Sequence, residues 1–254
     1  MHNVWVIAQG TILRQLRNKV LYLLIVLSFS LIGLGSLYKV LSLGAEIKLM
    51  RDLGLAGITI MGMVVAVFIG ANEVGKELRE GTVDDLLAKP LGRDEFLIGK
   101  YVGTVLVAMI NITVITLGFM GIMMYHTGSV HVDLLRALLM SFFEVSILVS
   151  ISIFFVTFLP EAAAAVITFI IFVAGHGAHM LPLISDQSAD IGIRVMATAL
   201  FYIVPNLHHF NLRAAVGQEV AIPWTYLVGA LLYGTCYTGM LLSLAVIIFR
   251  KREL

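Results

Sequence analysis

Seven residues from Gly70 to Lys76 form the pattern in this sequence that most suggests chemistry. Their order, Gly-Ala-Asn-Glu-Val-Gly-Lys, fits the start of a phosphate-binding loop. In such a loop a Ser or Thr follows the lysine and holds a magnesium ion, whereas Glu77 follows it here. The acids Glu73, Glu77 and Glu80 would also repel a triphosphate. We therefore expect that this chain neither binds nor hydrolyses ATP and that it binds no cofactor of its own.

Glu144 is the one carboxylate deep inside an apolar stretch. A charge at that depth of a membrane costs about 2.5–3.5 kcal/mol, so the side chain must face protein or water, or be protonated. Two interpretations remain open. Glu144 either contacts a cargo, an ion or a proton in a central pathway, or it makes a buried hydrogen bond between helices, to Ser, Asn or Tyr.

Histidines gather in the second half of the chain. His176 and His179 are three residues apart, which places them on one face of a helix, and Met180 adjoins them. His208 and His209 follow later. Imidazole and thioether groups suit a soft metal, but histidine is also common at polar interfaces. We expect no bound metal and keep these four histidines as the candidates.

Apolar residues dominate the composition. Of the 254 residues, 59% are hydrophobic and 13% charged, and the mean hydropathy is +0.98. A soluble domain has about 25% charged residues, so the solvent of this chain must be lipid. The formal net charge of +1 gives no reason to expect a nucleic acid as partner. The single cysteine, Cys236, excludes an intrachain disulfide, and we expect it to be a small core residue.

Six apolar stretches are long enough to cross a membrane, which takes about 20 residues in a helix. They cover residues 20–38, 53–72, 101–125, 134–158, 162–184 and 224–249. Helices are expected because lipid cannot satisfy free backbone groups. The sequence therefore predicts an all-α membrane protein with six transmembrane helices, residues 1–254 forming one permease-like transmembrane domain. The first stretch is expected to be a retained span rather than a signal peptide.

Two further helices are expected beside the spans. Residues Val4–Leu16 form an imperfect amphipathic pattern that suits a helix lying at the membrane interface, although they could also be the frayed start of a long first helix. Residues Val195–Val204 are apolar but too few to cross. The sequence predicts a partly inserted outer helix there, before the last span, which must pack on protein to shield its backbone ends.

Basic residues predict the orientation of the chain, because they favour cytoplasmic segments. With a cytoplasmic N-terminus, eleven of the 17 Lys and Arg residues lie inside and six lie outside. Both termini are therefore expected in the cytoplasm, as is the connection between the second and third spans. Most histidines, the four candidates among them, then fall on or near the outer side.

That connection is the most polar part of the chain, since twelve of the 33 charged residues lie between Glu73 and Lys100. Residues Thr82–Asp85 resemble a capping box, with Asp in place of Glu or Gln. Leu86 and Leu87 supply an apolar edge, and Pro90 ends the helix. The sequence predicts a short helix held at the membrane surface, with an apolar face suited to docking.

This segment resembles the signature between the second and third spans of type-2 ABC exporter permeases. The residues that carry the resemblance are Glu77, Gly81, Thr82, Leu86, Leu87, Pro90, Leu91, Arg93, Gly99 and Lys100. Pro205-Asn206 before the last span and the basic end at residues 250–252 are also similar to that family. The chain looks most like the small permeases of nitrous-oxide reductase maturation and of gliding motility.

The resemblance implies a non-catalytic subunit of a prokaryotic inner membrane. Two copies of the permease would pair with a dimer of cytoplasmic ABC ATPases, which would hold the ATP and magnesium, and export is the expected direction. A coupling helix over residues 82–90 would dock into the ATPase. The coupling residues that the resemblance implies are Glu77, Gly81, Thr82, Asp84, Asp85, Leu86, Leu87, Lys89, Pro90, Leu91 and Arg93.

Two other functions remain open. The chain could be a mechanochemical subunit that uses the same coupling to act on an outer-side partner protein, and the long connection from Ser185 to Pro223 permits this. It could also be an ion-coupled secondary transporter with Glu144 as the relay. A lone intramembrane carboxylate and the absence of an evident internal repeat weigh against the latter.

Overall fold

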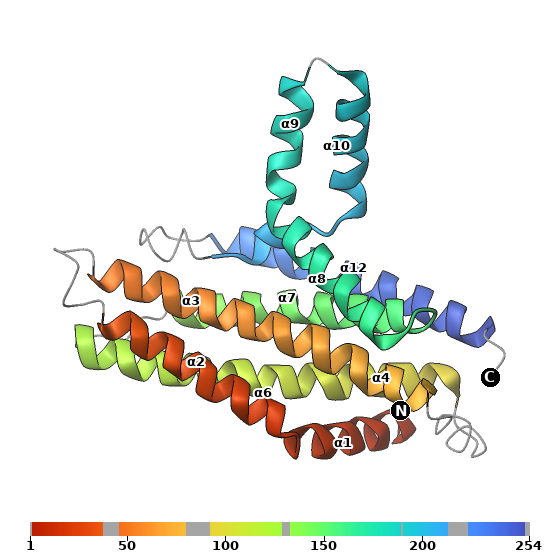
Figure 1. Ribbon diagram of the computed structural model, residues 1–254, viewed down its shortest axis with the longest axis horizontal. Coiled ribbons are helices and arrows are strands. Elements are labelled where there is room, and N and C mark those ends of the chain that lie inside the picture. The colour runs from red at the N-terminus through yellow and green to blue at the C-terminus, as the bar shows by residue number, and fades with distance from the viewer. Residues whose placement is uncertain are drawn as a thin grey trace.

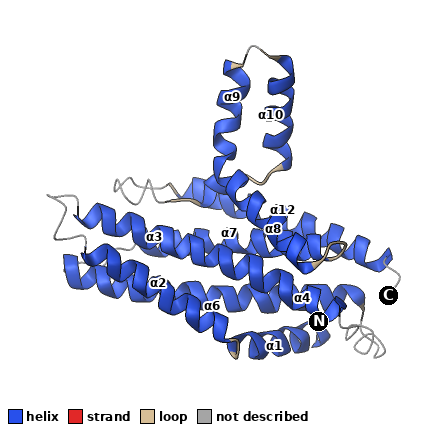
Figure 2. Cartoon of the chain, in the orientation of Figure 1, coloured by secondary structure: helices blue, strands red, loops and turns tan. Residues whose placement is uncertain are grey.

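The computed structural model describes residues 2–37, 46–79, 92–128, 133–188, 190–212 and 223–251. Within these ranges every regular element is a helix (Figure 2). The long helices form a bundle from which a two-helix arm projects (Figure 1). The start of α1 and the end of α12 lie at the same end of the bundle. The prediction of an all-α membrane protein is confirmed.

The N-terminal segment forms a helix of its own, as the amphipathic pattern predicted. Helix α1 covers His2–Leu16, and α2 follows over Lys19–Leu37. The turn between them is fixed by Asn18, whose side-chain oxygen accepts a hydrogen bond of 3.0 Å from the backbone N–H of Val20. Such a cap satisfies one of the backbone donors that a helix leaves free at its first turn. The chain therefore changes direction at a defined corner.

The second and third predicted spans lie in helices longer than the apolar windows. Helix α3 (Glu46–Val64) continues through a π-helical turn, η2 (Val65–Ile69), into α4 (Gly70–Arg79). Helix α6 covers Arg93–Thr127 and so begins before the predicted third span, residues 101–125. Its 35 residues are about 52 Å long. Both helices therefore extend beyond the hydrocarbon and place charged residues next to residues 80–91.

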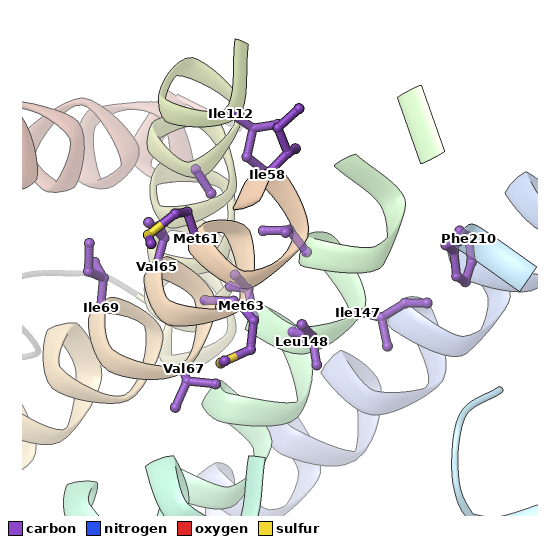
Figure 3. Close-up of a cluster of buried hydrophobic side chains, with 14 of the residues drawn as sticks. Ile58, Met61, Met63, Val65, Val67, Ile69, Ile112, Ile147, Leu148 and Phe210 are labelled. Atoms are coloured by element: carbon purple, nitrogen blue, oxygen red, sulfur yellow. The ribbon is translucent and has the colours of Figure 1, made fainter. Parts of the chain in front are cut away.

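The core of the bundle lies where α3, η2 and α6 meet α7 (Asp133–Val156). Side chains of Met61, Val65, Ile112 and Leu148 pack there (Figure 3). Helix α7 is buried on most of its surface and contacts α4, α6, α8 and α12. It is the central helix, and Glu144 lies near its middle.

The fifth predicted span, residues 162–184, lies within one continuous helical stretch, Glu161–Gln187, that is long and apolar enough to cross a membrane. The stretch consists of helix α8 (Glu161–Gly177), a 3₁₀ turn η3 (Ala178–Met180) and helix α9 (Leu181–Gln187). Just before the turn, Gly175 closely approaches the backbone of Pro205, since a Cβ on Gly175 would lie 2.7 Å from that carbonyl oxygen.

The short helix predicted before the last span is present as α10 (Ile191–Ile203) and begins four residues before the predicted start. It packs mainly on α9, and the two helices form the arm in Figure 1. A 3₁₀ turn η4 (Leu207–Phe210) returns the chain to the bundle.

Helix α12 (Trp224–Lys251) contains the last predicted span. Cys236 on this helix is exposed, so its assignment to the core was wrong. Among the described residues, five continuous helical stretches are long and apolar enough to cross a membrane. The first predicted span, residues 20–38, falls in α2, whose fully described apolar part, Lys19–Ser30, is shorter.

Candidate functional site

Most of the coupling residues implied by the resemblance lie outside the described residues. These are Gly81, Thr82, Asp84, Asp85, Leu86, Leu87, Lys89, Pro90 and Leu91. Glu77 and Arg93 are described, and they stand near the end of α4 and at the start of α6. The structure therefore shows how the two ends of residues 80–91 are attached to the bundle.

Glu77 lies in a group of four charged side chains, the anchoring cluster, made of Arg14, Glu73, Glu77 and Lys100. Lys100 Nζ donates to Glu77 Oε1 at 2.7 Å and to Glu73 Oε2 at 3.4 Å. Arg14 Nη1 donates to Glu77 Oε1 from the other side and lies 3.9 Å from Glu73 Oε2. The side chains of Lys100 and Glu77 are only 3% and 6% exposed. Three helices, α1, α4 and α6, are thus joined by charges, of which those of Lys100 and Glu77 are removed from water while that of Arg14 remains exposed.

The anchoring cluster balances two carboxylates against two cations. Buried charges of this kind are tolerated only when they are paired and hydrogen-bonded. The hydrogen bond to Glu77 raises the pKa of the Arg14 guanidinium, and the charges of Glu77 and Glu73 act in the same direction against its partial burial. Arg14 is therefore firmly cationic, and α1 is held to α4 by charge while it packs on α6.

Close backbone contact also holds α1 against α6. A Cβ on Gly99 would lie 2.8 Å from Ile7 Cβ, and a Cβ on Gly103 would lie 2.9 Å from the carbonyl oxygen of Ala8. Gln15 Nε2 donates to Thr104 Oγ1 at 3.1 Å. From one of these contacts to the next, the residue numbers increase in both helices. Helix α1 therefore runs alongside the start of α6 in the same direction.

A second attachment joins the end of α4 to α8. Arg79 Nη1 donates to Glu161 Oε1 at the start of α8, and the Arg79 side chain is largely exposed. A Cβ on Gly75 would meet Glu161 Cβ at 2.7 Å, so α4 and α8 touch closely there. These contacts connect α4 directly to α8.

Arg93 attaches the start of α6 to the end of α12. Its Nη1 donates to the carbonyl oxygens of Phe249 at 3.3 Å and Arg250 at 3.1 Å, which lie in the last turn of α12. An arginine at a helix C-terminus suits both the free carbonyls and the helix dipole. Arg250 in turn lies 3.3 Å from Asp94 Oδ2, and the Phe96 and Phe249 rings stack at 6.1 Å. Both ends of residues 80–91 are therefore fixed to the bundle, at α4 and at α6.

Glu144 faces the protein interior, as expected, and is 2% exposed. The partner that the structure shows for it is His176 of α8, with 3.4 Å between Oε1 and Nε2, rather than the Ser, Asn or Tyr that the sequence suggested. His176 Nδ1 lies 3.2 Å from the carbonyl oxygen of Phe172, which can only accept, so Nδ1 carries a hydrogen. The two side chains therefore meet in the interior between α7 and α8.

The other candidate histidines lie around η3 and η4. The rings of His179 and His208 stack with centroids 4.0 Å apart, and His209 makes edge contacts with Tyr226 and Tyr233. Burial lowers the pKa of both His208 and His209, and the nearby His179 and His209 lower that of His208 further. No group of three His, Cys, Asp or Glu side chains suited to a metal occurs in the part of the chain that the structure describes. The arrangement is that of packed aromatic rings.

A cleft of about 590 Å³ lies between the α3–η2–α4 stretch and α8. Its walls are largely apolar and include Val67, Phe68 and Phe169, while Asn72 and Glu161 line it as well. The π-helical turn η2 forms part of its wall, and such turns often mark functional positions in helices. The cleft was not predicted from the sequence, because hydropathy shows which helices cross and not which faces stay apart.

A family model described as ABC-2 family transporter protein matches residues 8–254. A search of curated proteins found no match. Since the match covers nearly the entire sequence, from within α1 to the C-terminus, the chain belongs to the ABC-2 family of transporter proteins and is a membrane permease of the ABC type.

Proposed function

We propose that this chain is the transmembrane subunit of an exporter of a prokaryotic inner membrane, driven by a separate cytoplasmic ABC ATPase. Two copies form the pathway, and both termini face the cytoplasm. Residues 82–90 form the coupling helix that seats in the ATPase. ATP and magnesium are held by that partner, and this chain contributes no catalytic group.

The observation that carries the proposal is the attachment of both ends of residues 80–91. A segment that transmits force needs firm connections to the helices it moves. On one side the anchoring cluster ties α4 to α1 and α6, and Arg79 ties it to α8. On the other side Arg93 and Asp94 tie α6 to the end of α12. These attachments reach five of the bundle helices.

The mechanism follows from these connections. Closure of the ATPase on ATP displaces the coupling helix and with it α4 and α6. Because α8 follows α4 through Glu161, the cleft beside Phe68 and Phe169 changes shape as α4 moves. In this mechanism the partner ATPase binds ATP with a different affinity in each of two global conformations of the permease. That difference in affinity is the coupling free energy. The cleft is the candidate cargo contact, and Glu144 remains a candidate pathway residue.

Co-expression of the chain with its partner ATPase tests the proposal. In the Leu86→Asp/Leu87→Asp variant the apolar edge of the coupling helix loses its seat, where each buried leucine contributes about 1.5–3 kcal/mol. We expect the variant to insert normally but to lose co-purification of the ATPase and ATP-driven transport. The Leu86→Ile/Leu87→Ile variant keeps the apolar surface and is expected to behave as the wild type. Normal transport by the Asp variant would refute this role of the helix.

A mechanochemical role is the second candidate, and the arm favours it. Helix α10 exposes Ile191, Val195, Met196 and Tyr202, and such a surface suits contact with another protein. In this case the ATPase coupling is the same, but the moving element acts on an outer-side protein and no cargo crosses. An outer protein retained after gentle purification, with no transported substrate, would favour this function over export.

A further inference from the structure

The corner between α1 and α2 has a surface that no part of the coupling mechanism uses. Arg17 and Lys19 are exposed there, on either side of the capping residue Asn18. No acidic residue occurs in the first 45 positions of the chain, so the segment is purely basic. Among the described residues neither Arg17 nor Lys19 forms an ion pair. Two cations therefore stand uncompensated at a defined turn of the backbone.

Directly after this corner, α2 presents side chains suited to lipid. Tyr22, Leu23 and Val26 are 60%, 65% and 63% exposed. Together with Lys19 they occupy positions i, i+3, i+4 and i+7, which share one face of a helix. The order along this face is a cation, then a tyrosine, then branched apolar side chains. Tyrosine is enriched at the level of lipid headgroups, with apolar side chains deeper and basic side chains further out.

We propose that the α1–α2 corner binds an anionic phospholipid of the adjoining leaflet. Arg17 and Lys19 contact its phosphate, Tyr22 lies beside the glycerol region, and Leu23 and Val26 contact the acyl chains. Charge complementarity selects the lipid, because a basic residue near an anionic membrane surface raises affinity by about fivefold. The corner needs no coupling segment and no ATPase, so the proposal is independent of the function proposed above.

Such a lipid would also lie near the anchoring cluster. Arg14 lies in the last turn of α1, three residues before Arg17 in the turn that follows. Its side chain is 58% exposed, and its Nη1 reaches Glu77 and Glu73. A lipid phosphate at Arg17 stabilises the orientation of α1 in which Arg14 makes those contacts. Anionic lipid content would therefore act on the same helix that holds α4.

Fluorescence quenching by brominated lipids tests the proposal on the full-length chain in vesicles. The chain has two tryptophans, Trp5 and Trp224, so Trp5→Phe/Trp224→Phe/Tyr22→Trp leaves one reporter at the corner. Vesicles contain phosphatidylglycerol and phosphatidylcholine in equal amounts, with one of the two brominated on its acyl chains. We expect brominated phosphatidylglycerol to quench as if enriched about fivefold at the reporter. Equal quenching by the two brominated lipids would overturn the proposal.

Variants that remove charges from the same single-tryptophan protein show which residues bind the lipid. Arg17→Gln/Lys19→Gln is expected to abolish the preference, whereas Arg194→Gln, which removes an exposed charge on the arm, leaves it intact. The single variants Arg17→Gln and Lys19→Gln guard against an insertion defect in the double variant and should each lower the preference. A preference that survives the double variant would refute the site. Loss of the preference on addition of inorganic phosphate would show a free-anion site and refute the choice of lipid.

Discussion

Glu77 and Glu161 are both carboxylates that pair with an arginine of another helix, but their surroundings differ. Glu77 is buried and also accepts from the buried Lys100, whereas Glu161 pairs with a largely exposed Arg79. Removing one partner of a buried pair leaves an uncompensated charge, while an exposed pair contributes little because water and salt screen it. The two sites therefore offer a matched comparison within one protein.

We expect Glu77→Gln to lower the free energy of unfolding by about 3 kcal/mol, at the lower end of the usual range for such losses because Glu73 remains near Lys100. Glu161→Gln should lower it by about 1 kcal/mol or less. Thermal unfolding of both variants in the same detergent measures the difference. If the two variants lost equal free energy of unfolding, Glu77 and Lys100 would not be shielded from solvent as their low exposed fractions indicate.

The contact between Glu144 and His176 can be tested with substitutions of the two residues. Glu144→Gln should insert and fold, because an amide removes the charge cost and keeps hydrogen-bonding capacity. Because the two side chains are 3.4 Å apart, Glu144→Gln, His176→Gln and the double variant should show a coupling of about 0.5–3 kcal/mol in thermal unfolding. Additive losses would contradict it.

The activity of Glu144→Gln separates the two roles that the sequence left open. Transport lost with assembly intact supports a cargo or proton role. Unchanged transport with lower thermal stability supports a structural bond between α7 and α8.

For single residues, the sequence predicted where a side chain lies better than it predicted which residue that side chain contacts. It placed Glu144 in the interior and drew attention to Glu77 and Arg93. It could not find Lys100 as the partner of Glu77 or the end of α12 as the partner of Arg93, which lie 23 and 157 residues away. Residue spacing reports contacts within one helix, whereas these contacts depend on which helices become neighbours. The exposure of Cys236 was missed for the same reason.

At the scale of elements, the packing of α1 on α6 depends on glycine. Helix α1 buries Ala8, Thr11 and Gln15 against α6, and Gly103 leaves room for that face. The interface is narrow enough that one methyl group should disturb it. The neighbouring Gly10 has no atom within 4 Å of a would-be Cβ and provides the control.

Gly103→Ala is expected to lower stability by about 1–3 kcal/mol, because the added Cβ overpacks against the backbone of α1. Gly10→Ala should be neutral or raise stability by up to about 1 kcal/mol, because alanine favours the helix. Thermal unfolding in detergent measures both, and Trp5 fluorescence reports on α1 itself. A stable Gly103→Ala variant with unchanged Trp5 emission would show that α1 does not depend on this close approach.

Hydropathy predicted where helices occur but not where they end. Helices α4 and α6 both continue beyond the predicted apolar windows into charged residues. Hydropathy also did not predict the 3₁₀ turn between α8 and α9 or the close approach of Gly175 to Pro205 beside it. A window of apolar residues does not show which distant residues come into contact.

At the scale of the whole molecule, the bundle is organised around two attachments that converge on one end. The described helices next to residues 80–91 are each tied to another helix by charged side chains, and the start of α1 and the end of α12 lie at that same end. The arm projects elsewhere and shares none of these contacts. An ATPase acting on residues 80–91 would therefore move the bundle as a connected unit.

The central claim is that a separate ATPase drives this chain through residues 80–91, and site-specific photocrosslinking in the membrane tests it most directly. A photoreactive amino acid replaces Leu87 in one sample and the exposed Tyr202 of the arm in another, and mass spectrometry identifies the product. We predict that an ABC ATPase is crosslinked from position 87 and not from position 202. Absence of an ATPase product at position 87 in a variant that still transports normally, or an ATPase product from position 202 alone, would contradict the claim.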